Sequence, residues 1–91
     1  MSGNITHGMS VEDVRNLGQQ LQTLSGQIGD MVNQLNSRIG STSWVGADAS
    51  MFKDQWWPEH RNLLTKVQAD LHGFGQSALN NATEQEDVSS R

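Results

Sequence analysis

The stretch that decides the fold is residues 14–35, which read VRNLGQQLQTLSGQIGDMVNQL. Apolar side chains recur here at intervals of three and four residues, the spacing that places them on one face of an α-helix. The row comprises Val14, Leu17, Leu21, Leu24, Ile28, Met31 and Leu35, and Ile39 extends it. Ser10 precedes the row as a candidate N-cap, with Asp13 three residues later. The pattern predicts an amphipathic helix over residues 11–39.

A second helix is predicted after a turn. Residues 40–46, GSTSWVG, interrupt the periodicity with small and turn-forming residues. Helical spacing then resumes over residues 47–82 in two rows. The first row contains Ala49, Phe52, Trp56, His60, Leu63, Val67, Phe74 and Ala78, and the second contains Trp57, Leu64, Leu71 and Ala78. Pro58 removes one backbone donor and crowds the preceding turn, so we expect a kink between Asp54 and Pro58.

The composition bounds the domain organisation. The chain has 91 residues, no cysteine and a formal net charge of -4, which suits one small acidic domain. We predict a flexible leader over residues 1–9, a helical hairpin over residues 10–83 and a mobile acidic tail over residues 84–91. The acidic balance and the scattered Lys and Arg residues argue against nucleic acid and anionic membrane surfaces. We expect neither a signal peptide nor stable membrane insertion, because no long apolar run occurs.

The apolar surface of such a hairpin is too broad for two helices to cover. Six side chains are expected to lie wholly or partly in water, namely Val32, Ile39, Met51, Trp57, Leu64 and Leu71. At about 25 cal/mol per Å², exposing several large side chains forfeits several kcal/mol, comparable with the stability of a small domain. We therefore predict an all-α hairpin that pairs with a second hairpin in a four-helix bundle. The alternative is a monomer whose stripe folds back at the kink near Pro58.

The predicted dimer interface combines the apolar rows of both helices. It comprises Leu17, Leu21, Leu24, Ile28, Met31, Leu35, Phe52, Trp56, Trp57, Leu63, Leu64, Val67 and Leu71. Gly18 and Ser25 flank the row of the first helix, and we expect their small size to let a neighbouring helix come close.

The turn carries a resemblance to a known family. Trp44-Val45-Gly46 between two amphipathic helices, followed by Ala49, Phe52 and Trp56, resembles the WXG family of small type VII secretion substrates, which includes the early secreted antigen proteins of actinobacteria. The resemblance covers residues 10–87. It implies a hairpin that pairs antiparallel with a second hairpin and leaves the cytoplasm as a folded dimer, without a cleavable signal peptide. It also implies that the turn of one subunit and the tail of the other form an export signal for a secretion ATPase.

The tail departs from the family pattern. The tail part of the signal is a Tyr followed four residues later by an acid, whereas this chain has Thr83 at the aromatic position and keeps the acid as Asp87. We therefore expect a sister chain of the family to supply the Tyr, which favours a heterodimer over a homodimer. At the turn, Gly46 would allow the chain to reverse, and Trp44 would cover the end of the bundle.

The sequence offers no constellation for catalysis, a metal or a cofactor. His7, His60 and His72 are too far apart for a local metal motif, and neither a nucleophile elbow nor a phosphate loop occurs. His60 falls on the apolar stripe and is interpreted as a residue at the edge of the core. Together with this absence, the resemblance to the WXG family implies a non-enzymatic secretion substrate or partner subunit. The alternative is a general helical adaptor that acts as a homodimer, unrelated to secretion.

Overall fold

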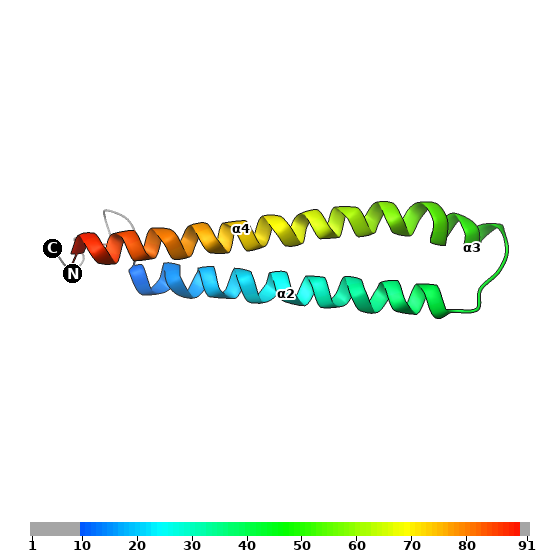
Figure 1. Cartoon of the computed structure of the whole chain (residues 1–91), viewed down its shortest axis with the longest axis horizontal. Coiled ribbons are helices and arrows are strands. Elements are labelled where there is room, and N and C mark those ends of the chain that lie inside the picture. The colour runs from blue at the N-terminus through cyan, green and yellow to red at the C-terminus, as the bar shows by residue number, and fades with distance from the viewer. Residues whose placement is uncertain (1–9, 90–91) are drawn as a thin grey trace.

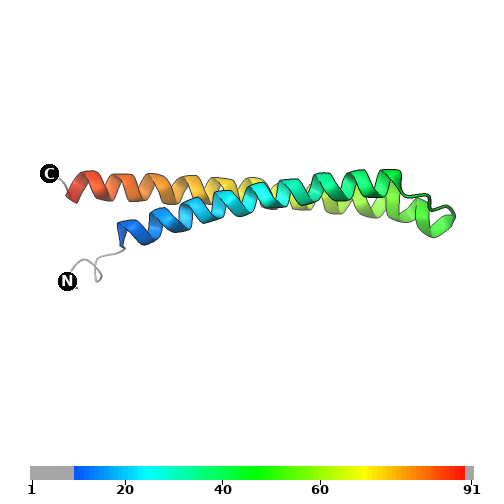
Figure 2. The ribbon, with the colours of Figure 1, turned by 90° about the horizontal axis from the view of Figure 1, so that it is seen from below.

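The computed structural model describes residues 10–89, with side chains as far as Asp87, and forms a long hairpin of two antiparallel helical arms. Figure 1 and Figure 2 show the arms side by side along their length, with the turn at one end. The molecule measures 65 × 18 × 17 Å. No strand occurs over residues 10–89, so the predicted all-α hairpin is confirmed. The leader predicted for residues 1–9 lies outside the described residues.

The first arm is a single helix, α2 (Val11–Ser41). The predicted cap is present, because the backbone N–H of Asp13 donates to Ser10 Oγ over 3.3 Å. At the other end the backbone N–H of Thr42 donates to the carbonyl of Arg38 at 3.0 Å, and the Thr42 hydroxyl donates to the same carbonyl. These caps satisfy end groups that a helix cannot pair internally, and the helix extends two residues beyond its predicted end.

The second arm contains three segments, α3 (Ala47–Met51), the π-helical segment η1 (Phe52–Trp56) and α4 (Trp57–Ser89). Within η1 the backbone N–H of Trp57 donates to the carbonyl of Phe52, five residues earlier. Pro58 lies just beyond, where it has no N–H for the carbonyl four residues before it, and the wider π turn makes room for its ring. The disturbance expected near Pro58 therefore takes the form of a π-helical turn.

The second arm is longer than the sequence predicted. Helix α4 continues to Ser89, so residues 84–89 are helical, and the predicted end of the helix at residue 82 is wrong. One contact with α2 supports this extension, the ion pair of Arg15 with Glu86 at 3.1 Å, and Ala82 in the preceding turn is completely buried. Because Gly18 lies beside Gly75, Val11 is level with Ala82, so the last turns of α4 extend beyond the start of α2 (Figure 1).

The seam between the arms combines small residues with a few larger apolar side chains. On α2 the buried residues are Gly18, Ser25 and Val32, at intervals of seven. On α4 they are Trp57, Gly75 and Ala82. The expectation that Val32 and Trp57 lie in water is wrong, since they are 7% and 5% exposed. Ile39, Leu64 and Leu71 are half-buried along the same seam, and Met51 is exposed as expected.

The backbones of the two arms come close together where two glycines meet. A Cβ atom built on Gly18 would lie 2.8 Å from the carbonyl oxygen of Gly75, and one built on Gly75 would lie 2.8 Å from the carbonyl oxygen of Gly18. Both distances are shorter than van der Waals contact, so a side chain at either position would force the arms apart. The prediction that Gly18 and Ser25 permit close approach is confirmed.

Polar contacts fix the register of the arms. The Ser25 hydroxyl donates to the carbonyl of Gln68 at 2.9 Å, across the middle of the seam. Near the turn, Asn36 Oδ1 accepts from Trp57 Nε1 at 3.1 Å and from Arg61 at 3.0 Å. The indole of Trp57 is thus buried with its polar group satisfied.

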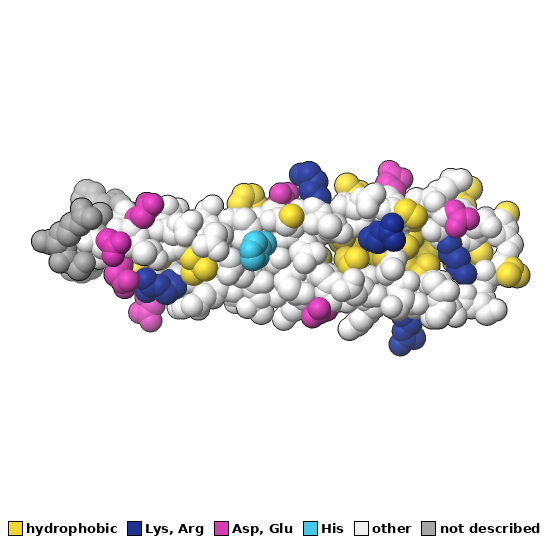
Figure 3. Space-filling view, viewed as in Figure 1, with side chains coloured by type: hydrophobic (Ala, Val, Ile, Leu, Met, Phe, Trp, Pro, Cys, Tyr) yellow, Lys and Arg dark blue, Asp and Glu magenta, His cyan; other side chains and the backbone are white. Residues whose placement is uncertain are grey.

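Figure 3 shows a broad face that is mostly polar and uncharged, with apolar side chains gathered between the arms toward the turn.

Candidate functional site

Two rows of large apolar side chains remain exposed on the hairpin. They are between 44% and 63% exposed. On α2 the row contains Leu17, Leu24, Met31 and Leu35, with Leu21 and Ile28 half-buried among them. On α4 the row contains Trp56, Leu63, Val67 and Phe74. A single hairpin therefore leaves much of the area of its large apolar side chains exposed to solvent.

Both rows lie on the same side of the hairpin. Each residue of an α-helix is rotated by about 100° from the one before, so on both helices the exposed row lies about 80° from the seam, in the same rotational sense. Because the arms run antiparallel, equal rotations in the same sense turn both rows toward one side. We call this surface, formed by the two exposed rows with Leu21 and Ile28, the apolar face. A contiguous surface of this kind marks an interaction site more often than isolated apolar residues do.

The predicted interface residues divide between the apolar face and the seam. Nine of the thirteen belong to the face, and Phe52 borders it at the turn. The other three are Trp57, which is buried inside the hairpin, and Leu64 and Leu71, which are half-buried along the seam. Those three contribute mainly to the hairpin itself. Phe74 was not among the predicted interface residues, although its spacing of seven residues from Val67 was a usable signal.

The turn is held by one glycine and one lysine. Gly46 caps α3 with φ 117° and ψ 175°, a conformation that essentially only glycine adopts. The carbonyl of Gly46 accepts from the backbone N–H of Ser50 at 3.0 Å. Lys53 Nζ reaches back to donate to the carbonyls of Thr42 at 2.9 Å and Trp44 at 3.4 Å. The predicted chain reversal at Gly46 is confirmed, and the role of Lys53 was not foreseen.

Aromatic rings continue from the turn onto α4. The ring centroids of Trp44 and Phe52 lie 5.6 Å apart, those of Phe52 and Trp56 4.9 Å, and those of Trp56 and His60 3.9 Å. His60 Nδ1 lies 2.8 Å from the carbonyl oxygen of Trp56. Since a carbonyl can only accept, this ring nitrogen carries a hydrogen. We call these four residues the aromatic ladder; it joins the turn to the apolar face.

A shallow groove lies beside the ladder. It has a volume of about 230 Å³ and is lined by Trp44, Asp48, Met51, Phe52 and Trp56. Trp44 is 45% exposed and packs on the outside of Phe52. The surface at the turn is therefore apolar and accessible, with one carboxylate among its aromatic rings.

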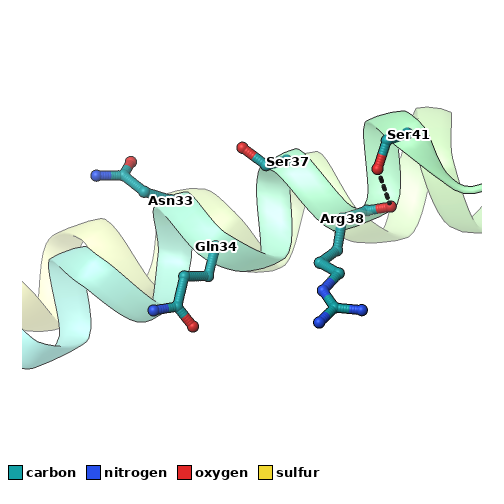
Figure 4. A pocket seen from close by; sticks show the side chains of 5 residues that line it. All are labelled: Asn33, Gln34, Ser37, Arg38 and Ser41. Atoms are coloured by element: carbon teal, nitrogen blue, oxygen red, sulfur yellow. Dashed lines mark hydrogen bonds between the residues drawn. The ribbon is translucent and has the colours of Figure 1, made fainter.

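A further surface hollow, on the first arm, does not bring reactive groups together. It has a volume of about 550 Å³ and is lined by Asn33, Gln34, Ser37, Arg38 and Ser41, all from α2. Figure 4 shows these side chains pointing in different directions along one helix; the only bond among them joins the Ser41 hydroxyl to the Arg38 carbonyl at 3.3 Å. Over the described residues, no three His, Cys, Asp or Glu side chains lie close enough together to share a metal ion. The described helices also include none with the length and hydropathy needed to cross a bilayer.

No family model, curated protein or solved structure matches the chain.

The Trp44 turn and the tail residues Thr83 and Asp87 lie at opposite ends of the hairpin. The Trp44 turn is at one end, and Thr83 and Asp87 are near the other, on the last turns of α4 (Figure 1). Both tail residues are exposed and one helical turn apart. Because the arms are long and straight, one chain cannot bring its own turn and tail together.

Proposed function

We propose that this chain is a non-catalytic, dimer-forming substrate or partner subunit of a type VII secretion system, similar to the WXG family. One observation carries the proposal: an apolar face covers one side of a two-helix hairpin whose turn displays Trp44 before a left-handed Gly46. A second hairpin would bury the exposed side chains of the apolar face, and the turn presents Trp44 for recognition by the secretion ATPase.

The second hairpin would complete a four-helix bundle. Eight large side chains of the apolar face are about half exposed, and covering them would bury an area typical of stable interfaces, of the order of 2,000 Å² in total. Burial of apolar area contributes about 25 cal/mol per Å² before the costs of association are subtracted. A dimer of hairpins is thus the arrangement that best uses this surface.

Antiparallel pairing would also join the separated parts of the export signal. When two hairpins run in opposite directions, the Trp44 turn of one lies beside the tail of the other. In this chain the tail has Thr83 where the family has Tyr. We therefore propose that a sister chain supplies the Tyr-bearing tail, and that the secretion ATPase reads that tail together with the Trp44 turn. Export would proceed from the cytoplasm without a cleavable signal peptide.

The proposal is tested by substituting Trp44→Ala in a strain that expresses the secretion system and the sister chain. We expect the variant to keep its dimer but to lose export, because the exposed ring belongs to the signal. Val45→Ala is the matched control, since Val45 lies in the same turn and is 89% exposed; it should be exported normally. Normal export of the Trp44 variant would contradict the proposal.

A second candidate function is a general helical adaptor that acts as a homodimer, unrelated to secretion. The tail without tyrosine favours it. Trp44 then serves only to pack against Phe52, whose centroid is 5.6 Å away. In that case Trp44→Ala would lower the melting temperature, and Trp44→Phe would restore it.

A further inference from the structure

The groove at the turn combines one open aromatic face with one carboxylate. Trp44 ends the aromatic ladder and contacts one ring of it, that of Phe52, at an interplanar angle of 50°. Phe52 and Trp56 stack at an interplanar angle of 20°, and Trp56 stacks at the same angle on His60. The faces of these inner rings are therefore used within the ladder, whereas Trp44, which is 45% exposed, keeps a face open to solvent.

The carboxylate of the groove belongs to Asp48. It lines the same hollow as Trp44, is exposed, and forms no ion pair within residues 10–87. The nearest cation along the chain, Lys53, donates instead to the carbonyls of Thr42 and Trp44 at 2.9 and 3.4 Å. A carboxylate in the first turn of a helix is also favoured by the helix dipole, so Asp48 by itself indicates no ligand. The open indole face beside it is not explained in that way and adds a second group that attracts a cation.

Both groups favour a positively charged ligand. The face of an aromatic ring carries a negative electrostatic potential and attracts cations within about 6 Å of its centre, most strongly when the ring is that of Trp. A carboxylate accepts N–H bonds that are stronger when the donor is charged. The net charge of -4 on the chain adds a weaker, long-range attraction. The groove is therefore complementary to a cation rather than to an anion or a purely apolar group.

The size of the groove and its hydrogen-bond acceptor select among cations. Its volume of about 230 Å³ is below the roughly 300–1,000 Å³ of pockets that bury a drug-sized ligand, so it suits a single side chain. A quaternary ammonium has no N–H for Asp48, and a lysine ammonium has no plane to stack on Trp44. A guanidinium stacks on an aromatic face and donates two parallel N–H bonds to a carboxylate. The exposed Met51 in the same lining offers apolar surface to the methylene stem of an arginine.

We infer that the groove at the turn binds an arginine side chain of a partner protein, with the guanidinium stacked on the indole of Trp44 and hydrogen-bonded to Asp48. The inference goes beyond the proposed function, because the site lies within one hairpin and requires neither a second hairpin nor export. Trp44, Asp48 and Met51 also lie outside the apolar face, which the groove meets at Phe52 and Trp56.

The test is a titration of the isotope-labelled full chain with capped arginine, N-acetyl-arginine amide, followed by nuclear magnetic resonance of the indole N–H groups of its three Trp residues. We expect the Trp44 signal to shift most, with a dissociation constant in the millimolar range, as suits a single side chain on an open site. Trp57 is the internal control, because its indole is buried and bonded to Asn36. Capped citrulline has the same shape without the charge and should bind at least about tenfold more weakly. Equal binding of citrulline, or an equal shift of Trp57, would overturn the inference.

Matched variants separate the groove from the overall charge, with the backbone amide of residue 48 as the common signal. Asp48→Asn should weaken the binding of capped arginine about fivefold, whereas Asp54→Asn, at an exposed position outside the groove, should change it less than about twofold. Trp44→Leu keeps an apolar side chain beside Phe52 but removes the aromatic face, and should weaken binding about threefold. Equal losses in the two asparagine variants would show that net charge alone attracts the ligand and would refute the site. Choline, a quaternary ammonium, should bind more weakly than capped arginine, and equal binding of the two would rule out recognition of a guanidinium.

Discussion

The close approach of the arms at Gly18 gives the sharpest prediction for stability. Replacing Gly18 by Ala adds a Cβ atom 2.8 Å from the Gly75 carbonyl oxygen and 2.9 Å from Leu79 Cγ. Ordinary contact begins near 3.4 Å, so the arms must separate by several tenths of an ångström. Overpacking of this kind costs about 1–3 kcal/mol. The same substitution gains about 1 kcal/mol, because Ala is a better helix former than Gly.

Gly26→Ala is the matched control, since it lies on the same helix and a Cβ there has no neighbour within 4 Å. Both variants share the gain in helix propensity, so the difference in unfolding free energy between them isolates the clash. We expect Gly18→Ala to be about 1–3 kcal/mol less stable than Gly26→Ala. That difference corresponds to about 4–8 °C in Tm per kcal/mol for a domain of this size. Thermal and urea unfolding, followed by circular dichroism at one protein concentration, measure it. Equal stability of the two alanine variants would refute the proposed packing of the seam.

Three further predictions concern the turn and the seam. Gly46→Ala should destabilise the hairpin by about 1–3 kcal/mol in urea unfolding although no atom lies near its Cβ, because its φ of 117° is strained for any side chain; an unchanged midpoint would contradict this. Trp57→Phe should lose about 1 kcal/mol with the bond to Asn36, in addition to the cost of a smaller ring at a buried position, and it should cost about 1 kcal/mol less when Asn36 is already Ala. Lys53→Met should speed amide hydrogen exchange at Thr42, whose N–H is bonded to the Arg38 carbonyl, since it removes the two bonds from the lysine to the turn; protection equal to that of the original chain would show that the lysine is dispensable.

The helices could be predicted from the sequence because the information for them is local. The spacing from Val14 to Leu35, the Ser10 cap and the turn residues at 40–46 depend on neighbours within a few positions. The end of α4 could not be predicted in this way. It accompanies the burial of Ala82 and the ion pair of Arg15 with Glu86, and this pair joins distant parts of the chain.

Sequence periodicity also could not decide which apolar residues pack in the seam and which lie on the outer face. The breadth of the apolar arc predicts that Trp57, Leu64 and Leu71 lie wholly or partly in water. Leu64 and Leu71 are half-buried, whereas Trp57 is buried. The arms pack through their small residues, with Gly18 against Gly75, and this contact turns Trp57 inward to Asn36. The large side chains of the apolar face are consequently left outside. A periodic pattern shows that residues share a face, but the fit between two helices decides which face turns inward.

The mass of the chain in dilute solution tests most directly whether a second hairpin covers the apolar face. We expect the full-length chain, alone or with its sister chain, to sediment at micromolar concentration as a pair of hairpins, about twice the 10.0 kDa of one chain when it pairs with itself. Replacing Leu24 and Leu63 by Lys should reduce the pair to single, still helical chains. A fully helical 10.0 kDa monomer that persists at these concentrations in the presence of the sister chain would contradict the account.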